Sequence, residues 1–182
     1  MNKTFPEILD IIRPRITGVP VSSCIGDRKR SLASVFEEQV TPCFIALRCS
    51  VINLKSKTAL LDKNMAYYTL QGIAIGCLVL YAYLKKQEYI DVSILDSLAN
   101  TYAQKNADYG DAFTKVYNEM GIVSAYTRIA DKYYRIENLI GTMSVVIQGL
   151  TCANYESLED SLLDTVNYAM MSVMVISNEG IK

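Results

Sequence analysis

Three polar residues interrupt an apolar segment near the C-terminal end of the sequence: Asp160, Asp164 and Asn167. Their spacing of four and then three residues places them on one side of a helix. From Leu162 onward nearly every neighbouring side chain is apolar or small. A carboxylate among apolar neighbours needs a cation, a metal ion or a ligand as its partner. Exposure of this side of the helix to water is the alternative.

A second group of polar residues precedes this segment and is mainly cationic. Arg128, Asp131 and Arg135 recur at three- and four-residue spacing, with Lys132 beside them. Two guanidinium groups and an ammonium group are suited to holding phosphate oxygens. A solvated helix face with intrahelical ion pairs is the alternative interpretation.

A third group lies in the segment "AQKNADYGDAF". We expect Lys105 to end a helix there, because Asn106 and Gly110 favour turn conformations. Asp108 and Tyr109 then lie in the connection, where Lys105 could bind a phosphate and the Tyr109 ring could stack on a base. A helix-terminating turn with no ligand is the alternative.

The sequence contains no histidine, which excludes His-based catalytic triads, His–Cys dyads and His-ligated zinc. Oxygen ligands on helices suit Mg²⁺, which bridges to the phosphates of a substrate. We therefore expect Asp160 and Asp164 to be the ligands if the protein binds Mg²⁺. Carboxylate-held metal is the main catalytic route open to this chain.

The net charge and the cysteine content indicate which binding partners and which cellular compartment to expect. The formal net charge is −1, so we expect no nucleic-acid polymer as a partner. Five cysteines, an odd number without a C-x-x-C pair, indicate reduced thiols. The first residues contain no long apolar stretch of a secretory signal, so we expect a cytoplasmic protein.

The elements that must position these residues are predicted to be helices. We expect an all-α protein: a helical bundle with an irregular N-terminal portion, forming a single domain over residues 1–182. Prolines confined to the first 42 residues make residues 1–60 irregular, and residues 61–182 form the bundle that carries the motifs. The predicted helices cover residues 5–12, 32–38, 62–87, 93–105, a short piece within 111–120, 122–140 and 157–176. Residues 41–54 fit either a helix or a buried strand. Gly141 is expected to end the helix predicted over residues 122–140.

Residues 65–84 form an uncharged segment about as long as a membrane span. Gly72 and Gly76 have the spacing of closely packed helices. We expect a buried core helix and no membrane partner, with a membrane-associated protein as the alternative. Because this segment is apolar all round, we also expect a homo-oligomer.

The segments "KNADYGDAF", "GIVSAYTRIADKYYRIENLI" and "ESLEDSLLDTVNYAMM" occur in this order. Together they resemble the nucleotide-modification-associated domain (type 1) family, over roughly residues 95–174. That family is common in phage genomes and is similar in helical character to the MazG-like all-α nucleoside triphosphate pyrophosphohydrolases. The resemblance implies a nucleotide-handling helical domain whose recurring polar positions are Lys105, Asn106, Asp108, Tyr109, Arg128, Asp131, Lys132, Arg135, Asp160, Asp164 and Asn167.

Two functions follow from these observations. The first is binding of a nucleotide or a nucleotide-derived signalling molecule, by which a phage could deprive a host defence of its messenger. The alternative is a Mg²⁺-dependent nucleoside triphosphate pyrophosphohydrolase with Asp131, Asp160 and Asp164 as catalytic residues. MazG-like enzymes carry paired acids on two helices, whereas "RIADKYYR" has one acid among three cations. This departure favours phosphate binding over catalysis.

Overall fold

The structure, a computed structural model, describes residues 2–26, 30–55, 62–146 and 155–179. Within these ranges the regular elements are helices, so the predicted all-α fold is confirmed. Their bounds are α1 Phe5–Ile16, α2 Val21–Ile25, α3 Leu32–Gln39, α4 Thr41–Lys55, α5 Lys63–Leu84, α6 Ser93–Tyr109, α7 Ala112–Met120, α8 Ile122–Val146 and α9 Tyr155–Asn178.

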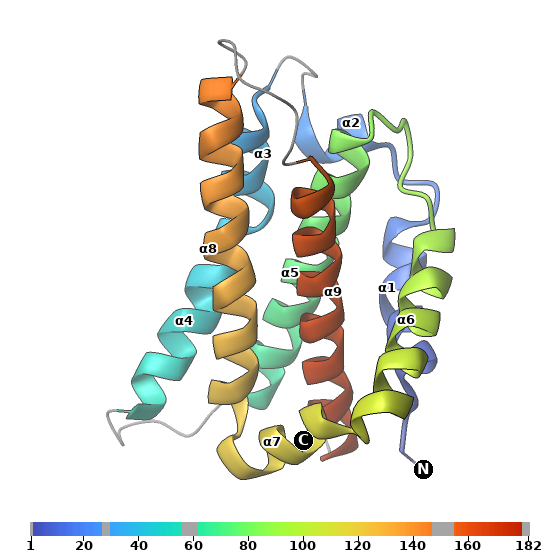
Figure 1. Cartoon of the computed structure of the whole chain (residues 1–182), viewed down its shortest axis with the longest axis vertical. Helices are drawn as coiled ribbons and strands as arrows, with labels where there is room; N and C mark the ends of the chain where they lie inside the picture. Colours follow the sequence, from blue (N-terminus) through green and yellow to red (C-terminus); the bar gives the residue numbers. More distant parts are fainter. Residues whose placement is uncertain (1, 27–29, 56–61, 147–154, 180–182) are drawn as a thin grey trace.

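Helices α5 and α9 lie side by side at the centre of the bundle (Figure 1). Helices α3, α4 and α8 pack on one side of this pair, and α1 and α6 lie on the other. The short helix α7 runs across one end and connects α6 to α8. Buried side chains of α1, α5, α8 and α9 belong to one continuous apolar core. As a result, α6, α7, α8 and α9 meet at one end of the molecule.

Helix α5 is long and apolar enough to span a membrane, alone among the described helices. In this structure 67% of its most apolar window is buried inside the bundle. A β-carbon built on Gly76 would lie 2.2 Å from the carbonyl oxygen of Gln39, and one on Gly72 would lie 2.5 Å from Cys43 Sγ. The two glycines therefore mark a close crossing of α5 with the α3–α4 region, as their spacing predicted.

The N-terminal portion is more regular than we expected from its prolines. Pro6 lies in the first turn of α1 and Pro42 in the first turn of α4, where a helix tolerates the missing N–H. Pro20 precedes α2, a short helix that the sequence did not predict, and Pro14 is accommodated inside α1. Residues 41–54, which also fitted a buried strand, form a helix.

Two predicted helix ends, on α6 and α8, are wrong. Lys105 does not end α6, which continues to Tyr109 and stops at Gly110 in the left-handed conformation, with φ 58°. The amide N–H of Gly110 donates to the carbonyl oxygen of Asn106, a bond that a glycine makes without steric penalty. Gly141 does not end α8, because its backbone stays helical and the helix continues to Val146.

Candidate functional site

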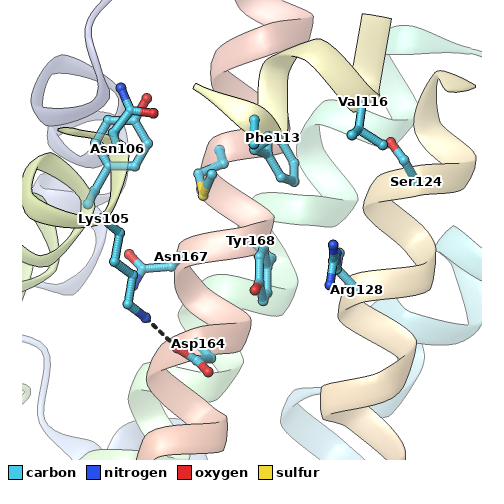
Figure 2. A pocket seen from close by; sticks show the side chains of 12 residues that line it. Lys105, Asn106, Phe113, Val116, Ser124, Arg128, Asp164, Asn167 and Tyr168 are labelled. Atoms are coloured by element: carbon cyan, nitrogen blue, oxygen red, sulfur yellow. Dashed lines mark ion pairs between the residues drawn. The ribbon is translucent and has the colours of Figure 1, made fainter. Parts of the chain in front are cut away.

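Two adjoining cavities lie among α6, α7, α8 and α9. The first has a volume of about 450 Å³ and the second about 420 Å³. Three residues line both cavities: Lys105, Asp164 and Asn167. Figure 2 shows the first cavity, in which Lys105 from α6 extends toward Asp164 of α9; Asn106 from α6, Asn167 and Tyr168 from α9 and Arg128 from α8 also line it.

The partners of the Asp164 carboxylate are two ammonium groups. Lys132 Nζ of α8 lies 2.8 Å from Oδ2, and Lys105 Nζ of α6 lies 3.6 Å from Oδ1 (dashed in Figure 2). The Asp164 side chain is 30% exposed and that of Lys132 only 18%. Asp164 therefore pairs with one cation from α6 and one from α8 at the boundary between the two cavities.

Asn167 lies one turn farther along α9 and is 9% exposed. Its Oδ1 atom is buried and has no hydrogen-bond partner among the described residues. A buried acceptor without a partner is destabilising, because it has lost water and gained nothing in exchange. The side chain points from α9 toward Lys105 in Figure 2. Asn167 thus lines the shared boundary with a buried Oδ1 acceptor that no described residue satisfies.

Cationic side chains outnumber acidic ones around the two cavities. Arg128 lines the first cavity, and Lys132 and Arg135 line the second together with Asp160. With the shared residues Lys105 and Asp164, four cations stand against two carboxylates. Such a balance in a concave surface favours an anionic ligand.

The first cavity also has an aromatic wall. The ring centroids of Phe113 and Tyr168 are 6.2 Å apart and their planes differ by 27°. Tyr102 lies on the opposite helix α6, and burial raises the pKa of its hydroxyl above the usual value, with a smaller contribution from Asp111. The second cavity has Ser97, Thr101 and Ser161 in its lining instead. The first cavity therefore suits a planar ring, and the second suits a polar, anionic group.

The structure brings together most of the residues singled out in the sequence. Asn106 lines the first cavity from within α6, and the exposed Asp160 lines the second. Asp131 and Asp108 are exposed and line neither of these two cavities. The side chain of Tyr109 lies outside the described part of the structure, so its predicted stacking role stays a prediction.

A magnesium site would have to use Asp160 and Asp164. Among the described residues, no group of three or more Asp, Glu, Cys or His side chains is arranged to hold a metal ion. Asp164 is already paired with two ammonium groups, which a divalent cation would have to displace. This donor set fits a phosphate better than it fits Mg²⁺.

Several lining residues were missed by the sequence analysis. Phe113, Tyr168 and Tyr102 resemble core residues because each is also partly buried against the core cluster. Ser97 and Thr101 precede Lys105 at intervals of four residues, which places all three on one face of α6. That spacing is a signal from which the polar wall of the second cavity could have been found.

The fold and the geometry of the two cavities have to be interpreted from their own residues. Comparison of the chain with known protein families, with curated proteins and with solved structures finds no match in any of the three. The resemblance to the nucleotide-modification-associated domain family therefore stays a prediction.

Proposed function

We propose that this protein binds a nucleotide or a nucleotide-derived signalling molecule. The ring occupies the aromatic first cavity, and the phosphates lie in the cationic second cavity. The single observation that carries this proposal is the adjacency of the two cavities, which share Lys105, Asp164 and Asn167. Adjoining aromatic and cationic surfaces are complementary to a molecule that joins a flat ring to a phosphate.

The phosphate end of the ligand is assigned to Lys105, Lys132 and Arg135. The lysines come from two helices and converge on Asp164, which keeps both ammonium groups at one point. A phosphate entering the second cavity competes with this carboxylate for the ammonium groups. Asp164 therefore orients the cations but weakens the binding of a single phosphate group. Ligands with several phosphate groups are therefore expected to bind most tightly.

Capture of an intact ligand is favoured over hydrolysis. Asp131, one of three predicted catalytic acids, is exposed outside the lining of both cavities, and Asp164 is engaged by lysines. The predicted resemblance to a family common in phage genomes suggests that such capture would sequester a defence signal. The alternative, a Mg²⁺-dependent pyrophosphohydrolase, is supported by the lining of one cavity by both Asp160 and Asp164.

Isothermal titration calorimetry with the four ribonucleoside triphosphates and with cyclic dinucleotides, each with and without Mg²⁺, tests the proposal. We expect at least one of these ligands to bind at one site per chain and to be recovered intact. Lys132→Ala and Arg135→Ala should each weaken binding about tenfold or more, because hydrogen bonds to charged groups contribute ~1.5–3 kcal/mol. Arg48→Ala is the matched control, since Arg48 is exposed on α4 and lines neither of the two cavities.

Product analysis of the same mixtures separates capture from catalysis. Pyrophosphate release that requires Mg²⁺ and disappears in Asp164→Ala would replace capture by the enzymatic alternative. Absence of binding by every nucleotide in the panel would remove both functions. Equal loss of affinity in Arg48→Ala and Arg135→Ala would show that binding does not occur at these cavities.

A further inference from the structure

We infer that the ligand is a ribonucleotide and that Asn167 binds a hydroxyl group of its ribose. This inference rests on the proposed function and specifies which nucleotides the same site accepts. It concerns the discrimination of ribose from deoxyribose, since the two kinds of nucleotide carry the same bases and phosphates and differ in a sugar hydroxyl.

The position of Asn167 matches the position of the sugar in a nucleotide. The sugar of a nucleotide lies between its base and its phosphates. Asn167 lines both cavities and so lies where the aromatic cavity passes into the cationic one. Of the three residues at this boundary, Lys105 and Asp164 are occupied with each other. Asn167 is the shared residue whose buried oxygen has no partner among the described residues.

The chemistry of the side chain points to a hydroxyl. An amide has one group that accepts hydrogen bonds and one that donates them, and a hydroxyl can do both. A sugar hydroxyl therefore satisfies Asn167 whichever of its two amide groups faces the ligand. A carbon-bound hydrogen in its place, as in a deoxyribose, leaves the buried amide unsatisfied, and sites built around such a group reject ligands that lack the partner.

The burial of Asn167 adds to this discrimination. Its side chain is on the central helix α9, with 9% of the residue exposed, so water has little access to replace a missing ligand hydroxyl. The neighbouring positions Val166 and Met170 are fully buried, which fixes the helix at this point. The amide is consequently presented by a rigid element.

The test compares matched ribo-, 2′-deoxyribo- and 3′-deoxyribonucleoside triphosphates of the base that binds best, by calorimetry on the full chain. We expect wild type to bind the ribonucleotide about tenfold more tightly than one of the deoxy analogues, the size of one buried hydrogen bond with its desolvation penalty. Asn167→Ala should bind the ribonucleotide about as weakly as that analogue and should lose the preference.

Asn106→Ala is the matched control, because Asn106 is also an asparagine of the site but lines only the first cavity. This variant should keep the ratio between ribonucleotide and deoxyribonucleotide affinities, whatever its effect on the affinities themselves. If Asn167→Ala does not fold, judged by its thermal transition, Asn167→Ser keeps a small hydroxyl and should retain part of the preference.

The outcomes separate this inference from the proposed function. Equal affinity of wild type for the ribonucleotide and both deoxy analogues overturns the inference, while the proposed function stands. A ribose preference that survives in folded Asn167→Ala also overturns it, because another residue then makes the distinction. Failure of every nucleotide to bind overturns both.

Discussion

Asp164 and Asn167 are three residues apart on α9, yet their polar groups have opposite surroundings. Asp164 is held by Lys105 and Lys132, whereas Asn167 Oδ1 has no partner in the described part of the molecule. One residue gathers charge at the boundary of the cavities, and the other leaves a hydrogen-bonding group for a ligand. Two contrasting polar residues of α9 thus lie at the boundary between the two cavities.

Replacement of Asp164 by asparagine tests whether its carboxylate competes with the ligand. Asp164→Asn keeps the shape of the side chain but releases two ammonium groups from an ion pair. We expect nucleotide affinity, measured by calorimetry, to rise about fivefold, since an accessible ion pair contributes up to ~1 kcal/mol. A carboxylate that instead held Mg²⁺ for the ligand would make the same variant bind more weakly, and only in the presence of Mg²⁺.

The cysteines differ sharply in environment, which predicts different rates of alkylation. Cys77 is fully buried on α5, and burial raises the pKa of its thiol, whereas Cys49 on α4 is exposed. Because the thiolate is the reactive form and the reagent must reach the sulfur, iodoacetamide should modify the exposed Cys49 and leave Cys77 unmodified in the folded protein, even at pH 9. Peptide mass spectrometry measures each site, with urea-unfolded protein as the control. Rapid alkylation of Cys77 under native conditions would contradict its placement in the core.

At the scale of elements, the crossing of α5 with the α3–α4 region depends on small residues. Gly76 allows the backbone of α5 to approach the end of α3, where Gln39 exposes its carbonyl oxygen to the crossing. Helices α8 and α9, which carry much of the site, pack against the same framework of α3, α4 and α5. The positions of the cations therefore depend on this contact indirectly.

Gly76→Ala and Gly141→Ala form a matched pair of substitutions. The added methyl of Gly76→Ala would meet Gln39 O at 2.2 Å, so we expect the free energy of unfolding to fall by about 1–3 kcal/mol. Gly141 lies inside α8 with no described atom within 4 Å of an added β-carbon. Gly141→Ala should therefore raise the free energy of unfolding by about 0.5–1 kcal/mol. Urea denaturation measures both, and equal effects of the two substitutions would contradict the close crossing.

At the scale of the whole molecule, the apolar surface of α5 is covered largely by the chain itself. Helix α9 packs along it on one side, and α3 and α4 pack on the other. Helix α5 therefore does not need a second subunit to cover most of its apolar surface, and a homo-oligomer stays a prediction. Exposed apolar side chains also lie on α4, at Ile45 and Ile52.

Two substitutions on α5 test its placement at the centre of the bundle. Leu78 is fully buried, so Leu78→Ala should lower the free energy of unfolding by about 2–5 kcal/mol. Tyr68 is 66% exposed on the same helix, and Tyr68→Ala should change it by no more than about 0.5 kcal/mol. Both are measured by urea denaturation in buffer without detergent. Similar stabilities of Leu78→Ala and wild type would argue that α5 does not form the core.

The helical class, most helix positions and the close crossing at Gly72 and Gly76 could be predicted from the amino-acid sequence. These features follow from apolar periodicity and from local residue preferences, which act over a few neighbouring positions. The sequence analysis misplaced the end of α6, because Asn106 is compatible with both a turn and a helix. The helix ends at Gly110, which adopts the left-handed conformation.

The packing of the helices was needed to show which polar residues share a surface. Spacing along a helix showed that Arg128, Asp131 and Arg135 could recur on one face, but the packing of α8 against α9 directs Lys132 to Asp164 and leaves Asp131 exposed. The aromatic wall of Phe113 and Tyr168 joins helices that are distant in sequence. Contacts of this kind depend on how distant helices pack in space. Local sequence patterns describe only neighbouring positions along the chain and do not show which distant residues will meet.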